Sequence, residues 1–115
     1  MRKRPSSASS AGPRSSALLF AALGDPTRLW LITRLSGGGL MSITALTAGA
    51  RVTRQAISKH LRVLEGAGIV RGRRRGRESV WQLERRSLQE ARRYLTLISS
   101  QWDIALGRLR ELVEK

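Results

Sequence analysis

The C-terminal third of the chain carries its most regular apolar pattern. Over four heptads, apolar side chains recur at alternating steps of three and four residues, at Leu88, Ala91, Leu95, Ile98, Trp102, Ala105, Leu109 and Leu112. This spacing predicts one long helix over residues 84–115, with Ser87 and Glu90 as a capping box at its start. About 28 helical residues would extend for ~42 Å, which is longer than the rest of a small domain can cover. We therefore expect part of this apolar face to contact a second copy of the chain.

Residues 50–69, ARVTRQAISKHLRVLEGAGI, predict a second amphipathic helix over residues 53–66. Thr53 is a candidate N-cap, and Gly66 and Gly68 can end the helix because glycine tolerates the left-handed backbone of a C-terminal cap. The apolar side carries Ala56, Ile57, His60, Leu61 and Leu64. The opposite side carries hydrogen-bond donors and no acid, at Arg54, Gln55, Ser58, Lys59 and Arg62. Such a helix, about 10–12 Å wide, fits the major groove of B-DNA, although on its own the pattern fits a solvated helix equally well.

The segments before this helix favour the DNA-binding interpretation. Residues 17–23 predict a short first helix ended by Gly24, and Asp25-Pro26 predicts the N-cap and first position of a second helix. Residues 36–39, SGGG, break that helix. Residues 42–48 then predict a short helix capped by Ser42, followed by a turn at residues 49–52. A short helix, a tight turn and a second helix with a polar outer face are typical of a helix-turn-helix.

After Gly68 the periodicity changes to that of β-strands. Residues 69–72 and 79–83 predict two short strands, and residues 73–78, RRRGRE, predict a polar turn between them. A basic hairpin directly after a DNA-reading helix indicates a winged helix, whose arginines bind phosphates bidentately or enter a narrow minor groove. An arginine run can also be a solvated loop or a localisation signal, but its place beside the helix favours DNA.

The charge of the chain is concentrated in this region. The 115 residues carry a formal net charge of +14; residues 51–77 contain nine basic residues and one acid, Glu65, whereas residues 84–115 contain seven basic and five acidic residues. This distribution indicates a polyanionic partner. With no cysteine, one histidine and no clustered carboxylates, we expect no enzyme activity and no cofactor. Residues 1–16 lack an apolar period and are predicted to be a flexible basic tail before one domain over residues 17–115.

From Leu18 to Lys115 the sequence resembles the ArsR (ArsR/SmtB) family of bacterial winged-helix repressors. The resemblance lies in LGDPTRLWLITRL at residues 23–35, QAISKHLRVLEGAGIV at residues 55–70 and the hairpin RGRRRGRESVWQL at residues 71–83. It implies a homodimer on double-stranded DNA at a palindromic operator. Most family members repress transcription, often of their own operon, and release DNA when an inducer binds.

The resemblance also implies roles for individual residues. Base-reading positions correspond to Arg54, Gln55, Ser58 and Lys59. Phosphate contacts correspond to Thr53, Arg62, Arg73, Arg74, Arg75 and Arg77. Because members pair through their first and last helices, the implied dimer interface comprises Leu18, Leu19, Leu95, Ile98, Trp102, Ala105, Leu109 and Leu112.

The metal sensors of this family bind their effector through cysteines before the turn, or through Asp, His and Glu on the last helix. This chain has no cysteine, and its single histidine, His60, lies inside the reading helix. We therefore expect no metal site, and the sequence looks closer to the cysteine-free, non-metal-sensing branch. Whether an inducer exists, and which, stays open.

Together these patterns predict a mainly α fold with a small β-hairpin (α+β), a winged helix-turn-helix of about five helices and a two-stranded wing. The predicted function is a homodimeric transcriptional repressor, with autorepression as one form of that role. The predicted location is on DNA in the bacterial cytoplasm (nucleoid-associated) and not in a membrane. One alternative is a sequence-indifferent basic nucleoid-type or RNA-binding protein, and another is an adaptor that uses the last helix. Charge alone would not require Gln55 and Ser58 on the basic face. RNA readers usually present stacking aromatics, whereas Trp30 and Trp102 fall on apolar faces.

Overall fold

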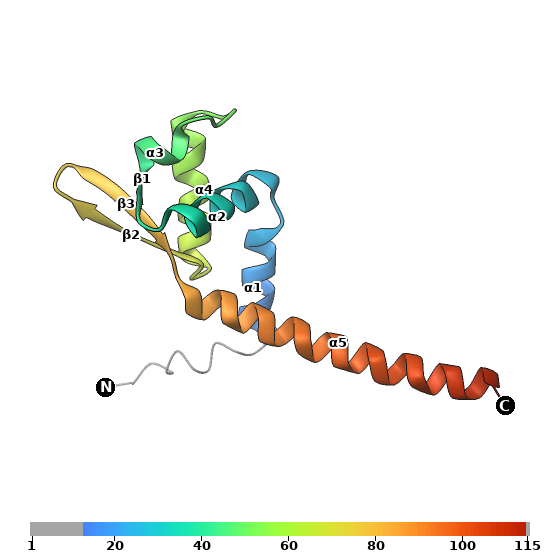
Figure 1. Cartoon of the computed structure of the whole chain (residues 1–115). Helices are drawn as coiled ribbons and strands as arrows, with labels where there is room; N and C mark the ends of the chain where they lie inside the picture. The colour runs from blue at the N-terminus through green and yellow to red at the C-terminus, as the bar shows by residue number, and fades with distance from the viewer. Residues whose placement is uncertain (1–12, 115) are drawn as a thin grey trace, which may run out of the picture.

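The computed structural model describes residues 13–114, which form five helices and a small antiparallel sheet (Figure 1). In chain order the elements are α1 (Pro13–Leu23), α2 (Pro26–Gly38), β1 (Met41–Ser42), α3 (Ile43–Thr47), α4 (Arg54–Gly66), β2 (Val70–Arg75), β3 (Glu78–Leu83) and α5 (Arg85–Glu114). The predicted winged helix-turn-helix is confirmed. Among the described residues, no helix combines the length and the apolar character needed to cross a membrane.

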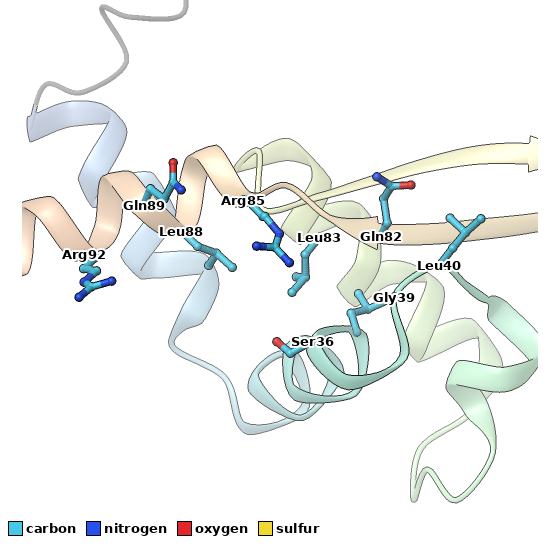
Figure 2. A pocket seen from close by; sticks show the side chains of 10 residues that line it. Ser36, Gly39, Leu40, Gln82, Leu83, Arg85, Leu88, Gln89 and Arg92 are labelled. Atoms are coloured by element: carbon cyan, nitrogen blue, oxygen red, sulfur yellow. The ribbon is translucent and has the colours of Figure 1, made fainter.

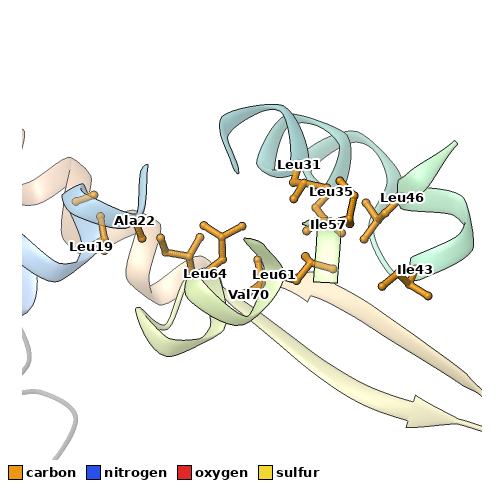
Figure 3. Close-up of a cluster of buried hydrophobic side chains, with 12 residues drawn as sticks. Leu19, Ala22, Leu31, Leu35, Ile43, Leu46, Ile57, Leu61, Leu64 and Val70 are labelled. Atoms are coloured by element: carbon orange, nitrogen blue, oxygen red, sulfur yellow. The ribbon is translucent and has the colours of Figure 1, made fainter. Parts of the chain in front are cut away.

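Helices α1 to α4 form a head around one apolar core (Figure 3). Helix α2 contributes Leu31 and Leu35, and α4 contributes Ile57, Leu61 and Leu64 at steps of four and three residues. These five side chains are fully or almost fully buried. Because α4 buries this stripe, its opposite face is fixed toward solvent.

The predicted helix caps before α4 are confirmed, with one change of boundary. Asp25 accepts hydrogen bonds from the Thr27 amide at 2.9 Å and the Arg28 amide at 3.1 Å, which starts α2. Ser42 caps α3 through the Ala45 amide at 3.1 Å. Helix α2 continues through the first two glycines of the SGGG run to Gly38, and Gly39, with a φ of 68°, is its C-cap.

The first helix begins at Pro13, four residues before its predicted start at residue 17. Proline suits a first helical turn, because its fixed φ is already helical and its missing N–H would have no partner there. Ser16, assigned to the tail on polarity, is buried. The predicted boundary at residue 17 is therefore one helical turn too late. The remaining predicted tail, residues 1–12, lies outside the described residues.

The sheet contains a third strand that the sequence did not reveal. Its strand order is β1-β3-β2, with both pairs antiparallel. The wing pairs β2 with β3 from Val70↔Leu83 to Arg75↔Glu78, and β1 adds Met41↔Trp81. A two-residue strand has no periodicity to detect, but it ties the start of α3 to the base of the wing.

Helix α5 begins at Arg85, and the predicted capping box at its start is wrong. Ser87 lies within the first turn, and its hydroxyl donates to the backbone carbonyl of Gly68. An N-cap residue precedes the first helical position, and Ser87 is already inside the helix, so it does not cap α5. The early turns of α5 pack on α1, where the rings of Phe20 and Tyr94 lie 6.0 Å apart. The helix then leaves the head (Figure 1), and every side chain over residues 99–114 is exposed.

Candidate nucleic-acid interface

Helix α4 presents its donor-rich face to solvent. Thr53 Oγ1 accepts a hydrogen bond from the Ala56 amide at 3.1 Å, which confirms the predicted N-cap. At 100° per residue, the predicted DNA-facing side chains span about 140° of the helix. Ser58 is half-buried and the others are exposed: Arg54, Gln55, Lys59 and Arg62. The Thr53 hydroxyl still has its hydrogen to donate, so capping does not prevent a phosphate contact.

The single histidine joins α4 to the start of α2. His60 Nδ1 lies 3.2 Å from a guanidinium nitrogen of Arg28 and 3.9 Å from Asp25 Oδ2. Arg28 also donates through Nε to the Ala22 carbonyl at 2.5 Å. This polar cluster links α4 to the start of α2 and the end of α1. Across residues 13–114, no three His, Asp or Glu side chains are grouped so that they could hold a metal ion.

The three consecutive arginines of the wing lie in a strand and not, as predicted, in a turn. Strand β2 continues to Arg75, paired with Glu78, and the turn is reduced to Gly76 and Arg77. Gly76 has a φ of 65°, which lets the hairpin reverse in so few residues. Because side chains alternate along a strand, Arg73 and Arg75 face one side of the wing and Arg74 the other. All of these arginines are exposed, so the wing offers positive charge on both sides.

Two glutamates hold the base of the wing, and neither was predicted from the sequence: Glu65 ties it to α4, and Glu84 ties the end of β3 to β2. Glu65 at the end of α4 accepts a hydrogen bond from the Gly72 amide at 3.3 Å. Glu84 pairs with Arg71 at 2.5 Å, and its amide donates to the Ile69 carbonyl at 2.8 Å. Glu65 is the single acid in the basic segment of residues 51–77, which was a usable signal. Arg71 is thereby held at the wing base, whereas the arginines further out extend beyond it.

Trp81 lies over Gly72 and not toward solvent for base stacking. The two residues are cross-strand partners, and a Cβ added to Gly72 would lie 2.5 to 2.7 Å from three atoms of the indole ring. Trp81 also packs against the apolar core. This arrangement disfavours an RNA-binding surface that uses Trp81 as a stacking platform.

Replacing Gly72 with alanine should destabilise the fold by about 1–3 kcal/mol, because the new methyl group must displace the Trp81 ring. Urea unfolding followed by circular dichroism measures the change. Gly37→Ala is the matched control: its added Cβ would meet nothing within 4 Å, so its stability should be unchanged or slightly higher. Equal stability of Gly72→Ala and the wild type would contradict the ring's position.

Acid should weaken the fold through Asp25. The pKa of its carboxyl is lowered from the ordinary value of 3.8, first by the hydrogen bond from the Arg28 amide, while partial desolvation opposes the shift and His60 and the Thr27 amide lower the pKa further. Folding therefore favours the carboxylate. Its stabilisation is fully present above the unfolded pKa and is lost as the pH falls through the lower pKa of the folded state.

Urea unfolding near pH 7 and about pH 3 tests this expectation. Asp25→Asn keeps a capping oxygen but no charge, so it should lose less stability on acidification than the wild type. Asp103→Asn, which removes an exposed carboxylate on α5, should lose as much as the wild type. If Asp25→Asn and the wild type lose the same free energy of unfolding on acidification, the Asp25 carboxylate does not contribute to the pH dependence of stability.

Comparison with known proteins identifies this arrangement. A helix-turn-helix domain family matches residues 23–73. The HTH-type transcriptional regulator Rv2034 of Mycobacterium tuberculosis is 34% identical over 101 residues, covering 88% of this chain and 91% of that protein. The structure of an ArsR-like transcriptional regulator from Rhodococcus sp. RHA1 is similar with a TM-score of 0.74 at 34% identity, covering 86% of this chain and 92% of that one. The chain belongs to the ArsR family.

As an ArsR-family protein, the chain is a DNA-binding transcriptional regulator and not an enzyme. In this family member α3 and α4 form the helix-turn-helix, and β2 and β3 form the wing. A homodimeric winged helix-turn-helix DNA-binding domain, Mb0332 of Mycobacterium bovis, is also similar, with a TM-score of 0.61 and coverage of 94% of this chain and 95% of that one. At 19% identity, this likeness shows the shared fold alone.

Proposed function

We propose that this ArsR-family regulator is a homodimeric repressor of a palindromic operator. In each copy α4 enters the major groove, and the wing arginines contact phosphates beside it. The observation that carries the proposal is the outer face of α4, which is rich in donors and is held toward solvent by the buried Ile57, Leu61 and Leu64. Its one acid, Glu65, lies in the last turn and accepts a hydrogen bond from the Gly72 amide. A face of this kind is suited to base edges and phosphates, and the basic wing beside it favours that role over a solvated face.

The proposed base readers are Arg54, Gln55, Ser58 and Lys59. Arginine pairs bidentately with guanine and glutamine with adenine, so the first two carry most of the expected sequence preference. The proposed phosphate contacts are Thr53, Arg62, Arg73, Arg74, Arg75 and Arg77, because guanidinium and hydroxyl donors around a reading helix fix its register on the duplex.

Helix α5 supports a second copy of the chain as the dimer partner. Its apolar side chains beyond the head are exposed, including Trp102 with 61% of its surface accessible. A hollow of about 240 Å³ on this face is lined by Ile98, Gln101, Trp102 and Ala105. The Mycobacterium bovis neighbour is described as homodimeric.

The α1 part of the proposed interface needs one correction. Leu18 is 60% exposed and stays in the proposed interface. Leu19 is only 4% exposed, because it packs into the core of its own chain. We therefore remove Leu19 from the interface and keep Leu95, Ile98, Trp102, Ala105, Leu109 and Leu112.

Selection of bound duplexes from a random pool tests the function directly. Two reading helices about one DNA turn apart, ~34–36 Å, should enrich an inverted repeat with half-sites centred ~10 bp apart. The selected site should bind about 10³-fold or more tightly than random DNA at physiological salt. Enrichment of no sequence would instead support a sequence-indifferent basic protein.

A bacterial reporter tests the sign of regulation. With the selected site placed between promoter and reporter gene, expression of the chain should lower reporter output, because a bound dimer blocks the polymerase. An increase would contradict repression while leaving DNA binding intact. Placing the site from the chain's own upstream region in the same reporter tests autorepression. A repressor of this kind acts on chromosomal DNA, so the proposed location is the cytoplasm, on the nucleoid.

A further inference from the structure

A pocket of about 520 Å³ lies where the end of α2, the base of β3 and the first turns of α5 meet (Figure 2). No residue that lines it belongs to α4, so it is separate from the proposed DNA-binding face. Its size falls within the roughly 300–1,000 Å³ typical of small-molecule sites. The proposed function does not use it.

The pocket combines an apolar floor with positive charge. Leu35, Leu83 and Leu88 supply apolar surface from the three elements that meet there. Arg85 and Arg92 line it from α5, two turns apart. Figure 2 shows Arg85, Leu83 and Leu88 pointing toward the end of α2, whereas Gln82 and Gln89 point away from it.

The charge of this pocket is not neutralised from within the chain. No acidic residue lines it, and neither the Arg85 nor the Arg92 side chain has an acidic partner among residues 13–114. Guanidinium groups are the side chains best suited to carboxylates, which they bind through paired N–H donors. Because apolar side chains lie beside the guanidinium group of Arg85, the pocket favours an anion that also carries a hydrocarbon part.

We propose that this pocket binds a small organic monocarboxylate with an apolar body. The ligand carboxylate accepts hydrogen bonds from Arg85, and its hydrocarbon part rests on Leu35, Leu83 and Leu88. Arg92, seven residues or ~10.5 Å further along the helix, adds positive potential at the pocket mouth. Arg85 therefore contributes more to affinity than Arg92.

The pocket is placed to affect DNA binding, a part of the proposal that rests on the proposed function. Its walls connect the head to α5, and β3 connects it to the wing and to β1. A ligand that bridges α2 and α5 biases the angle at which α5 leaves the head, and this angle sets the separation of the two reading helices in a dimer. The change in operator affinity equals the ratio of the ligand's affinities for the two α5 angles. This ratio is about 5- to 150-fold in typical allosteric proteins.

Ligand binding is tested on the full chain without DNA, by titrating ¹⁵N-labelled protein with decanoate, 1-naphthoate and decanol. We expect saturable amide shifts at residues 35–40 and 82–92 with at least one carboxylate, and at least about tenfold weaker binding of decanol. Arg85→Gln should weaken carboxylate binding about tenfold. Arg93→Gln removes the same charge from an exposed neighbour outside the pocket and should have no effect.

Three outcomes would overturn the pocket assignment: no saturable shift with either carboxylate, equal affinity for decanol, or equal losses in Arg85→Gln and Arg93→Gln. The decanol comparison needs no variant, so it stands even if a substitution perturbs folding. Regulation is tested by measuring operator affinity with and without the bound carboxylate. Ligand binding with unchanged operator affinity would overturn the regulatory part alone. If the random-pool selection enriches no sequence, the proposed function is wrong, but the ligand-binding assignment of the pocket is unaffected.

Discussion

Trp102→Glu should convert the protein to a monomer and abolish operator binding at concentrations where the wild type is fully bound. Trp102 lies on the exposed apolar face of α5, where it lines a hollow together with Ile98 and Ala105. In a symmetric dimer the substitution occurs twice in one interface, and a buried carboxylate without a partner costs several kcal/mol. Loss of the dimer also removes the second half-site contact, and with it a factor of about 10²–10⁴ in affinity.

Sedimentation equilibrium and gel-shift titration measure the two parts of this prediction. Thr96→Glu is the matched control, since it adds the same charge about 120° around the helix on the polar side and is also exposed. It should remain dimeric and bind the operator. Circular dichroism should show unchanged helix content in both variants. A Trp102→Glu protein that sediments like the wild type would remove α5 from the proposed interface.

Arg54→Ala should weaken the free energy of binding to the selected operator by ~1–3 kcal/mol and relax the preference at the base that Arg54 reads. Its side chain is exposed at the first turn of α4, where reading helices reach base edges. Gln55→Ala should behave alike at a neighbouring base. Arg74→Ala, on the wing, should instead weaken operator and random DNA by the same factor and lower the salt slope by ~0.9.

The comparison of operator with random duplex across a salt series separates these effects. Arg110→Ala, which removes an exposed arginine from the far end of α5, controls for net charge and should change neither affinity much. If Arg54→Ala and Arg74→Ala lose the same affinity on both duplexes, the proposed division between base reading and phosphate contact is wrong.

Local patterns accounted for most of the helices. The caps at Asp25, Ser42 and Thr53 were predicted correctly because a cap depends on residues within about three positions along the chain. The buried stripe of α4 followed from its period for the same reason. His60 is an intermediate case: the sequence placed it on the inner side, but only the structure showed its contacts with Asp25 and Arg28.

Errors arose where the partner is distant in sequence. Ser87 looked like a cap and instead donates to Gly68, nineteen residues earlier. The arginine run looked like a turn, because nothing within it signals that β3 would extend the pairing to Arg75. Leu19 looked like an interface residue from its place on the first helix, whereas packing against the head buries it.

Residue type and short-range spacing were enough to predict the order of the helices, the donor-rich face of α4, the charge concentrated beside it and the long apolar face of α5. Only the folded chain shows which groups hold the base of the wing, which apolar side chains stay uncovered, and that α2, β3 and α5 line a cationic pocket. These features depend on contacts between residues far apart in the chain, and such contacts exist only once the core has brought the elements together.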